Sequence, residues 1–428
     1  MLPVLAIVPI GCKLKPNLGG WMPDTMEQRA FVLSRRVVLL FAVACGASVA
    51  NVYFSQPLLV TMGHDLDMSP GAIGSVVTLT HVGYALGLFF LVPLGDVTDR
   101  RRLIVGQLGL LVVALGVVAT ARTAVVLLVG MAATGLFAVV TQTLVAFAAS
   151  LAPADGRGRV VGLVTGGVVV GILLARTVSG VMADLAGWRS VYVVSAGCVA
   201  VLALVLYRVL PSGDGAPGLP YGQLLRSTVS LFARERLLRV RALYGLLIFA
   251  AFSTLWSSVA LPLSSLSHSA VGALGLVGVV GALAAGVAGR LNDRGLSRWT
   301  TGIALALLVV SWLPLAFTRS SLWALAVGVV LLDLAVQAVH VTNQTLIYAS
   351  HPDAGSRVIG GYMIFYSIGS GAGALAATSL YAVGGWGAVC VLGAVFSGLG
   401  LVVWVFERTL RQVEGAAVLR DVRSCHQG

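Results

Sequence analysis

Residues 95–103 read GDVTDRRRL, and residues 289–298 read GRLNDRGLSR. Both stretches carry a Gly, an Asp and an Arg in the same order, and one lies in each half of the chain. Each stretch closes a long apolar segment, which is the second such segment of its half. This repetition predicts a chain built by duplication, in which an equivalent helix ends at each copy.

The composition places the chain in a lipid bilayer. Its 428 residues are 58% hydrophobic and only 10% charged, with a mean hydropathy of +0.97, whereas soluble domains are about 45–50% apolar. Because a backbone in lipid must satisfy its own hydrogen bonds, apolar runs of about 20 residues predict spanning helices. We expect an all-α membrane protein with twelve transmembrane helices in two six-helix bundles. The expected spans are 37–62, 71–95, 103–121, 124–151, 160–186, 190–210, 242–266, 270–289, 300–318, 321–348, 358–383 and 386–406.

The formal charge of +12 follows this helix map. Of the 28 Lys and Arg residues, only Arg122, Arg189 and Arg319 fall in connections on one side, and Arg176 lies within a span. The others lie on the opposite side together with both chain ends. The positive-inside rule therefore predicts that both termini are cytoplasmic. We expect a multi-pass protein of the plasma or inner membrane. The basic charge is explained in this way without a nucleic-acid partner.

The spans divide the chain into expected regions. These are a cytoplasmic extension 1–34, a six-helix bundle 35–210, a linker 211–240, a second bundle 241–406 and a cytoplasmic tail 407–428. The linker begins with PSGDGAPGLP and continues as YGQLLRSTVSLFARER, where Leu225, Val229 and Phe232 recur at i, i+4 and i+7. This spacing predicts an amphipathic helix, which either lies on the inner leaflet or forms a solvated hinge.

The duplication extends to a second pair of segments. QTLVAFAASLAPADGRGRVVG at 142–162 is similar to QTLIYASHPDAGSRVIGG at 344–361. With its repeated loop signature, twelve spans and long central linker, the chain resembles the major facilitator superfamily from about residue 35 to residue 406. The resemblance implies a monomeric transporter that works by alternating access, with substrate bound between the two halves near the bilayer midplane. It also implies a cytoplasmic gating role for Gly95, Asp99, Arg100, Gly289, Asp293 and Arg294.

The signature residues also carry expectations of their own. Gly95 and Gly289 are expected where a helix end passes so close to a neighbour that a side chain would block the fit. Asp99 and Asp293 can accept hydrogen bonds from a helix N-terminus or pair with a nearby Arg.

Ionisable residues deep in a span are costly and are therefore functional candidates. Asp333 begins a polar stripe at i, i+4, i+7 and i+11, which lies on one helix face. Arg176, from the other half, is expected at a similar depth. We expect the two charges to face each other, so that protonation or binding at Asp333 releases Arg176. There are two alternatives: the two residues form a permanent neutralising pair, or Arg176 binds an anionic substrate. The stripe consists of Asp333, Gln337, His340 and Gln344.

Other polar side chains are candidates for the substrate or proton pathway. The stretch NVYFSQPLL has Pro57 as an expected kink, and His81 shares a face of its span with Tyr84. Trp256, Tyr362 and Tyr366 either stack on an organic substrate or serve packing. The remaining pathway candidates are Asn51, Tyr53, Gln56 and Gln142.

The expected function is proton-coupled efflux of a small organic molecule. Drug antiporters of the superfamily usually carry a proline in the fifth span and an Arg in the fourth. Here the fifth span reads GILLARTVSG, without proline, and Met131 stands where the Arg is expected. In these features the chain resembles sugar and nucleoside efflux permeases more than drug antiporters. Proton-coupled or facilitated uptake is the alternative, and a receptor or scaffold is a third reading. No enzyme motif is present, and the spacing of the five cysteines predicts neither a metal nor a redox site. We therefore expect no cofactor.

Overall fold

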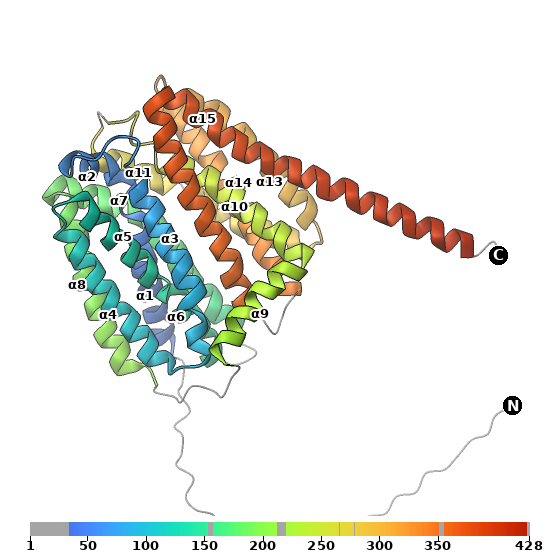
Figure 1. Ribbon diagram of the computed structural model, residues 1–428, viewed down its shortest axis with the longest axis horizontal. Helices are drawn as coiled ribbons and strands as arrows, with labels where there is room; N and C mark the ends of the chain where they lie inside the picture. The colour runs from blue at the N-terminus through green and yellow to red at the C-terminus, as the bar shows by residue number, and fades with distance from the viewer. Residues whose placement is uncertain are drawn as a thin grey trace, which may run out of the picture. The chain divides into compact units, whose positions relative to one another are not determined.

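The computed structural model describes residues 34–152, 157–211, 220–264, 266–277, 279–350 and 355–425. Over these residues all regular structure is helical, as predicted (Figure 1). The first half contains α1 (Arg35–Tyr53), η1 (Gln56–Leu58), α2 (Leu59–Asp65), α3 (Ser75–Phe90), η2 (Pro93–Asp96), α4 (Arg100–Ala119), α5 (Ala124–Ala138), α6 (Val140–Leu151), α7 (Arg157–Ala186) and α8 (Trp188–Val209). The linker forms α9 (Tyr221–Arg234), and the second half contains α10 (Arg236–Trp256), α11 (His268–Val277), α12 (Val279–Asp293), α13 (Ser297–Ala316), α14 (Leu322–Ser350) and α15 (Gly355–Cys425).

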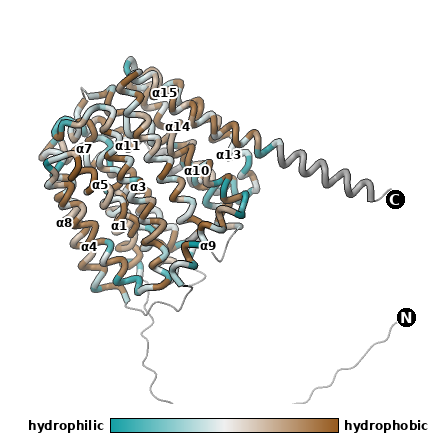
Figure 2. Tube along the Cα trace, viewed as in Figure 1, coloured by the Kyte–Doolittle hydropathy of each residue, from teal (hydrophilic) through white to brown (hydrophobic). Residues whose placement is uncertain are grey.

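The helices follow the expected spans, except that α10 ends at Trp256, ten residues before the expected end of the seventh span. Ten described segments are long and apolar enough to cross a membrane, and Figure 2 shows hydrophobic residues along most of their length. One of them, Val358–Thr409, covers 52 residues, which is too long for a single crossing. Within α15 Gly385 has φ 63° and ψ −159°, so the helix breaks there and supplies the last two expected spans. The expected eighth span coincides with α11 and α12.

Local sequence signals explain where several helices begin. Ser34 and Thr123 cap α1 and α5, because each side-chain oxygen accepts a hydrogen bond from the backbone N–H three residues later. Asp99 caps α4 through the backbone N–H two residues later, with 2.9 Å between its Oδ1 and the Arg101 nitrogen. Pro57 lies in η1, which separates α1 from α2 and confirms the expected kink.

Glycines bring two equivalent helix pairs together, one in each half. In α7, Gly167 and Gly171 lie directly against the backbone of α1 at Ala42 and Gly46. In α15, Gly369 and Gly373 lie in the same way against α10. Small residues allow such backbone contact between membrane helices. The duplication seen in the sequence is therefore repeated in the packing.

The bundle has two ends, which differ in the connections that they carry. The signature end is the end at which the α3–α4 connection lies, and the far end is the end at which α7 gives way to α8. In Figure 1 α2 and α11 lie toward the far end, whereas α9 lies at the signature end. We call residues 34–211 the N half and residues 236–409 the C half.

The linker helix α9 is present as predicted, but the three residues chosen for its apolar face are not buried together. Phe232 packs against α15, where its ring stacks on Phe365 with 5.7 Å between centroids. Val229 is 55% exposed. At the start of α9 the Tyr221 hydroxyl donates a 2.7 Å hydrogen bond to the Phe90 carbonyl of the N half. The helix therefore contacts both halves at the signature end.

Candidate functional site

Arg176 is buried where the two halves meet. Its side chain is 2% exposed, and its Nε donates a 2.7 Å hydrogen bond to Gln56 Oε1 from η1. The guanidinium lies 3.9 Å from the ring centroid of Trp256 in α10, with the rings of Tyr53 and Phe252 at 5.3 and 5.4 Å. Among the described residues, Arg176 Nη2 has no hydrogen-bond partner. The cation is thus held mainly by aromatic faces and one amide oxygen.

Asp333 of α14 contacts the same tryptophan. The carboxylate is 5% exposed, and Trp256 Nε1 donates a 3.3 Å hydrogen bond to its Oδ1. No ion pair within 4.0 Å joins Asp333 to Arg176 in the described structure, although each charge acts on the other electrostatically. The two charges therefore meet as expected across the halves, but Trp256 links them in place of direct contact.

A pair of tyrosines closes the neighbouring part of the interface. The hydroxyl groups of Tyr53 in α1 and Tyr366 in α15 are hydrogen-bonded to each other. Phe249 packs edge-on against Tyr366 with 4.0 Å between centroids, and the His81 ring lies 6.1 Å from the same tyrosine. We call Tyr53, Gln56, Arg176, Trp256, Asp333 and Tyr366 the central cluster. Both halves contribute to it.

The rest of the polar stripe on α14 lies beside this cluster. His340 Nδ1 and the Tyr362 hydroxyl form a 2.9 Å hydrogen bond, and Phe249 packs edge-on against the His340 ring at 5.1 Å. Gln337 and Gln344 are half-buried. Histidine and aromatic residues thus continue the central cluster along α14.

Three other candidates of the N half bond within that half. Asn51 Oδ1 accepts a 2.7 Å hydrogen bond from Ser195 of α8, which ties α1 to α8. Gln142 Nε2 donates to the Tyr84 hydroxyl at 3.4 Å. His81 is 1% exposed and bonds through Nδ1 to a backbone carbonyl of its own helix at 3.0 Å. Of these three, His81 lies beside Tyr366 of the central cluster.

The first signature loop is ordered by its own charges. Asp99 caps α4, which confirms that it accepts from a helix N-terminus. Arg100 Nε donates to the Gly95 carbonyl at 2.8 Å, and its Nη1 donates to Ser150 Oγ of α6 at 2.7 Å. These contacts stay within the N half.

The prediction that a side chain would not fit at the signature glycines is wrong. A Cβ at Gly95 would make ordinary van der Waals contact, with Thr143 Cγ2 at 3.8 Å, and a Cβ at Gly289 would meet no described atom within 4 Å. The reason is that the neighbouring described side chains leave room for a Cβ at Gly95, and that no described atom lies close to Gly289. In the second signature Asp293 and Arg294 are exposed.

A cavity of about 970 Å³ lies along α1 and α7. Its described wall is mostly small and apolar, and its charged residues are Arg35 and Arg159. Ala175 also lines it, so the cavity reaches the turn of α7 that carries Arg176. The sequence did not predict this cavity. No described group of three His, Cys, Asp or Glu side chains is placed to hold a metal ion.

Sequence reasoning missed one polar junction at the far end. Asp184 of α7, His268 of α11 and Thr61 of α2 form a chain of hydrogen bonds there. Asp184 lies near the end of an expected span, which is the one signal that could have singled it out. Its partner is distant in the sequence, so no spacing connects the two.

Comparison with known proteins agrees with the fold. The model of the Major Facilitator Superfamily matches residues 38–294 and 247–421. The chain is 46% identical over 376 residues to the uncharacterized transporter YgaY of Escherichia coli O157:H7, covering 87% of this chain and 95% of the relative. It is 26% identical over 376 residues to the "Probable sugar efflux transporter" of Pasteurella multocida, covering 86% and 91%.

A solved structure has the same fold. A bacterial homolog of the human lysosomal transporter Spinster, in an inward-facing and occupied conformation, superposes with a TM-score of 0.72 over 87% of this chain and 96% of that chain, at 15% identity. Apolar spans, a duplicated packing and a charged cluster shared by the two halves are thus accompanied by matches to transporters that cover 86–87% of this chain. The chain belongs to the Major Facilitator Superfamily and is a multi-pass membrane transporter of that type.

Proposed function

We propose that the protein exports a small organic molecule in exchange for protons, by alternating access. The observation that carries this proposal is the contact of Arg176, from the N half, and Asp333, from the C half, with the one indole ring of Trp256. Both side chains are buried. A buried charge in the membrane is costly, so such a residue is a functional candidate. The charge state of Asp333 is therefore coupled to the contact between the halves.

Protonation of Asp333 supplies the step that moves the halves. The neutral carboxyl group no longer offsets the charge of Arg176, so the buried cation favours a state with access to water. A hydroxyl or amino group of a substrate would hydrogen-bond the ionised form of Asp333. Proton and substrate then exclude each other at one carboxylate, which is the requirement for exchange. The name of the P. multocida relative supports export as the direction.

The proposed orientation places the signature end in the cytoplasm of a cell with a plasma or inner membrane. Arg100, Arg101 and Arg102 lie at this end, in accordance with the positive-inside rule. Residues 35–210 and 241–406 are the two moving bodies in this proposal, and the linker 211–240 joins them. Both chain termini are then cytoplasmic.

Contacts between the halves favour a state that is closed at the far end. Thr78 Oγ1 of the N half donates to the Gly371 carbonyl of the C half at 2.8 Å, and Thr378 Oγ1 donates to the Gly71 carbonyl at 3.3 Å. At the signature end Asp99 bonds within its own half. In the proposed orientation this state faces inward. The six signature residues are proposed to engage across the halves in the opposite state.

Ligand stabilisation tests the assignment of Asp333. The purified protein in detergent is screened by thermal shift against sugars, nucleosides and antibiotics at pH 6 and pH 8. The control variant is Asp65→Asn, because Asp65 pairs with Arg189 inside the N half. A ligand should stabilise wild type and Asp65→Asn more at pH 8, and Asp333→Asn should lose the pH dependence. Unchanged pH dependence in Asp333→Asn would show that the carboxylate is structural.

Proton movement tests the direction of coupling. The protein is reconstituted in liposomes that contain a pH-sensitive dye, and the ligand found by the screen is added outside. Exchange predicts that protons leave the liposomes as the ligand enters, so the lumen becomes alkaline. Acidification would indicate movement of ligand and proton together, and the export proposal would be replaced by coupled uptake.

A further inference from the structure

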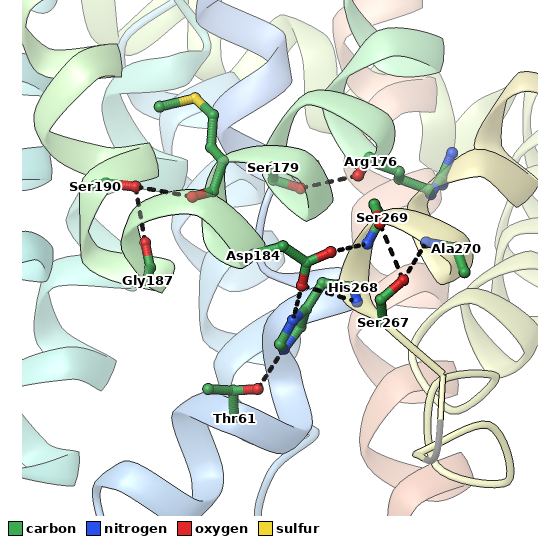
Figure 3. Close-up of polar contacts among 11 residues, drawn as sticks. Thr61, Arg176, Ser179, Asp184, Gly187, Ser190, Ser267, His268, Ser269 and Ala270 are labelled. Atoms are coloured by element: carbon green, nitrogen blue, oxygen red, sulfur yellow. Dashed lines mark hydrogen bonds and ion pairs between the residues drawn. The ribbon is translucent and has the colours of Figure 1, made fainter.

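Asp184 of the N half caps a helix of the C half. Its Oδ1 accepts hydrogen bonds from the His268 backbone nitrogen at 3.1 Å and from His268 Nδ1 at 2.6 Å, and its Oδ2 accepts from the Ser269 nitrogen at 2.8 Å (Figure 3). These two backbone N–H groups begin α11, so they have no carbonyl partner within the helix. A carboxylate at this position also interacts favourably with the positive end of the helix. One side chain thus holds the start of α11.

Further hydrogen bonds and close backbone packing hold α7, α11 and α2 together in the same region. His268 Nε2 and Thr61 Oγ1 of α2 form a 2.5 Å hydrogen bond, so the imidazole lies between α2 and α7 (Figure 3). Thr177 Oγ1 of α7 donates to the Gly272 carbonyl at 2.9 Å. Gly180 and Gly272 have no room for a side chain, because a Cβ would meet the backbone of the opposite helix. Asp184 therefore lies at the edge of a closely fitted seam between α7 and α11.

The charge at this seam distinguishes it from the other contacts at the far end. The seam between α3 and α15 is made by the hydroxyl groups of Thr78 and Thr378. Asp65 is also charged, but its partners Arg189 and Trp188 belong to its own half. Among the described far-end contacts, Asp184 is the carboxylate that crosses from one half to the other.

We propose that Asp184, His268 and Ser269 form a far-end latch, which holds the transporter closed at this end and must break in every cycle. The proposal rests on the alternating access proposed above. Arg176 and Asp184 lie on the same helix, eight residues or about 12 Å apart along its axis. Both contact the C half. When the latch opens and α7 moves, Arg176 must also leave Trp256. The latch therefore acts on the central cluster through α7, because it holds the helix that carries Arg176.

The conformational equilibrium can be measured without a substrate or a proton gradient. In a variant without the five cysteines, spin labels are placed at Val125 in α5 and Val383 in α15. These residues are 69% and 90% exposed, and they belong to opposite halves. Double electron–electron resonance then reports the populations closed and open at the far end. The variants are Asp184→Asn and His268→Gln, with Asp65→Asn as the matched control.

Asp184→Asn should raise the ratio of open to closed molecules five- to thirty-fold, which corresponds to about 1–2 kcal/mol. His268→Gln should raise it by a smaller factor, because it keeps the backbone donors to Asp184. Asp184→Glu should restore most of the closed population. Unchanged populations in Asp184→Asn, or an equal shift in Asp65→Asn, would overturn the proposal. Because this readout needs no transport, a latch that behaves as expected remains valid even if proton exchange is not observed.

Discussion

Removal of the charge of Arg176 should destabilise the protein in a way that depends on Asp333. Arg176→Met removes the 2.7 Å hydrogen bond to Gln56 and the stacking on Trp256 at 3.9 Å. A hydrogen bond from a charged donor contributes about 1.5–3 kcal/mol, and a desolvated cation–π contact contributes about 2 kcal/mol. We therefore expect Arg176→Met to lower the free energy of unfolding by about 3.5–5 kcal/mol.

The coupling between the two charges has an upper limit set by their separation. Two unit charges 4 Å apart interact by about 4 kcal/mol at an effective dielectric constant of 20. Arg176 and Asp333 form no ion pair within 4.0 Å, so we expect a coupling of about 2–3 kcal/mol. The double variant Arg176→Met/Asp333→Asn should accordingly lose about 2–3 kcal/mol less than the sum of the single variants.

A double-mutant cycle measures this coupling directly. Each variant is unfolded reversibly in mixed micelles of increasing SDS fraction and followed by circular dichroism. The exposed pair Asp65 and Arg189 at the far end provides a matched control cycle, for which we expect at most about 1 kcal/mol. A coupling below about 0.5 kcal/mol between Arg176 and Asp333 would refute the view that they form one electrostatic unit.

Three further predictions can be checked by unfolding measurements or by size-exclusion chromatography. Trp256→Phe keeps a ring beneath the guanidinium but removes the indole N–H, and should lower the unfolding free energy by about 1.5–3 kcal/mol; no loss would contradict the bridging role. Glu407→Gln weakens the part-buried 3.2 Å ion pair with Arg241 and should lower the unfolding free energy by about as much, which a thermal melt checks. Gly135→Leu places a side chain against the backbone of α3, whereas a Cβ at Gly116 meets no described atom within 4 Å. Size-exclusion chromatography should therefore show aggregated Gly135→Leu and monodisperse Gly116→Leu.

The helices could be predicted because lipid leaves the backbone few options. An apolar run of sufficient length must become a helix, so hydropathy alone located the spans. Pro57 could be assigned to a kink because proline donates no backbone hydrogen bond. The expected spans 358–383 and 386–406 also placed a break at residues 384–385, and the structure shows that Gly385 makes it with φ 63°, a conformation that glycine adopts readily.

The candidate site was predicted in part. A buried Arg and a buried Asp were expected to face each other, because each is too costly to lie in lipid, and in the structure both contact Trp256. The link through Trp256 could not be predicted, since it depends on how the two halves pack against each other. The same limit applies to Asn51, whose partner Ser195 lies on a helix far along the chain. The far-end latch joins Asp184 and His268, which are 84 residues apart.

The position of Trp256 has an optical consequence. One face of its indole lies over a cation, and its N–H is directed at a carboxylate, in an environment shielded from water. The excited state of indole is sensitive to nearby charge, so separation of the halves should change the wavelength and yield of its emission. The difference between the spectra of the wild type and Trp256→Phe isolates this signal from the other tryptophans. The protein therefore contains its own fluorophore at the point where its halves part, and their movement can be followed in unlabelled molecules.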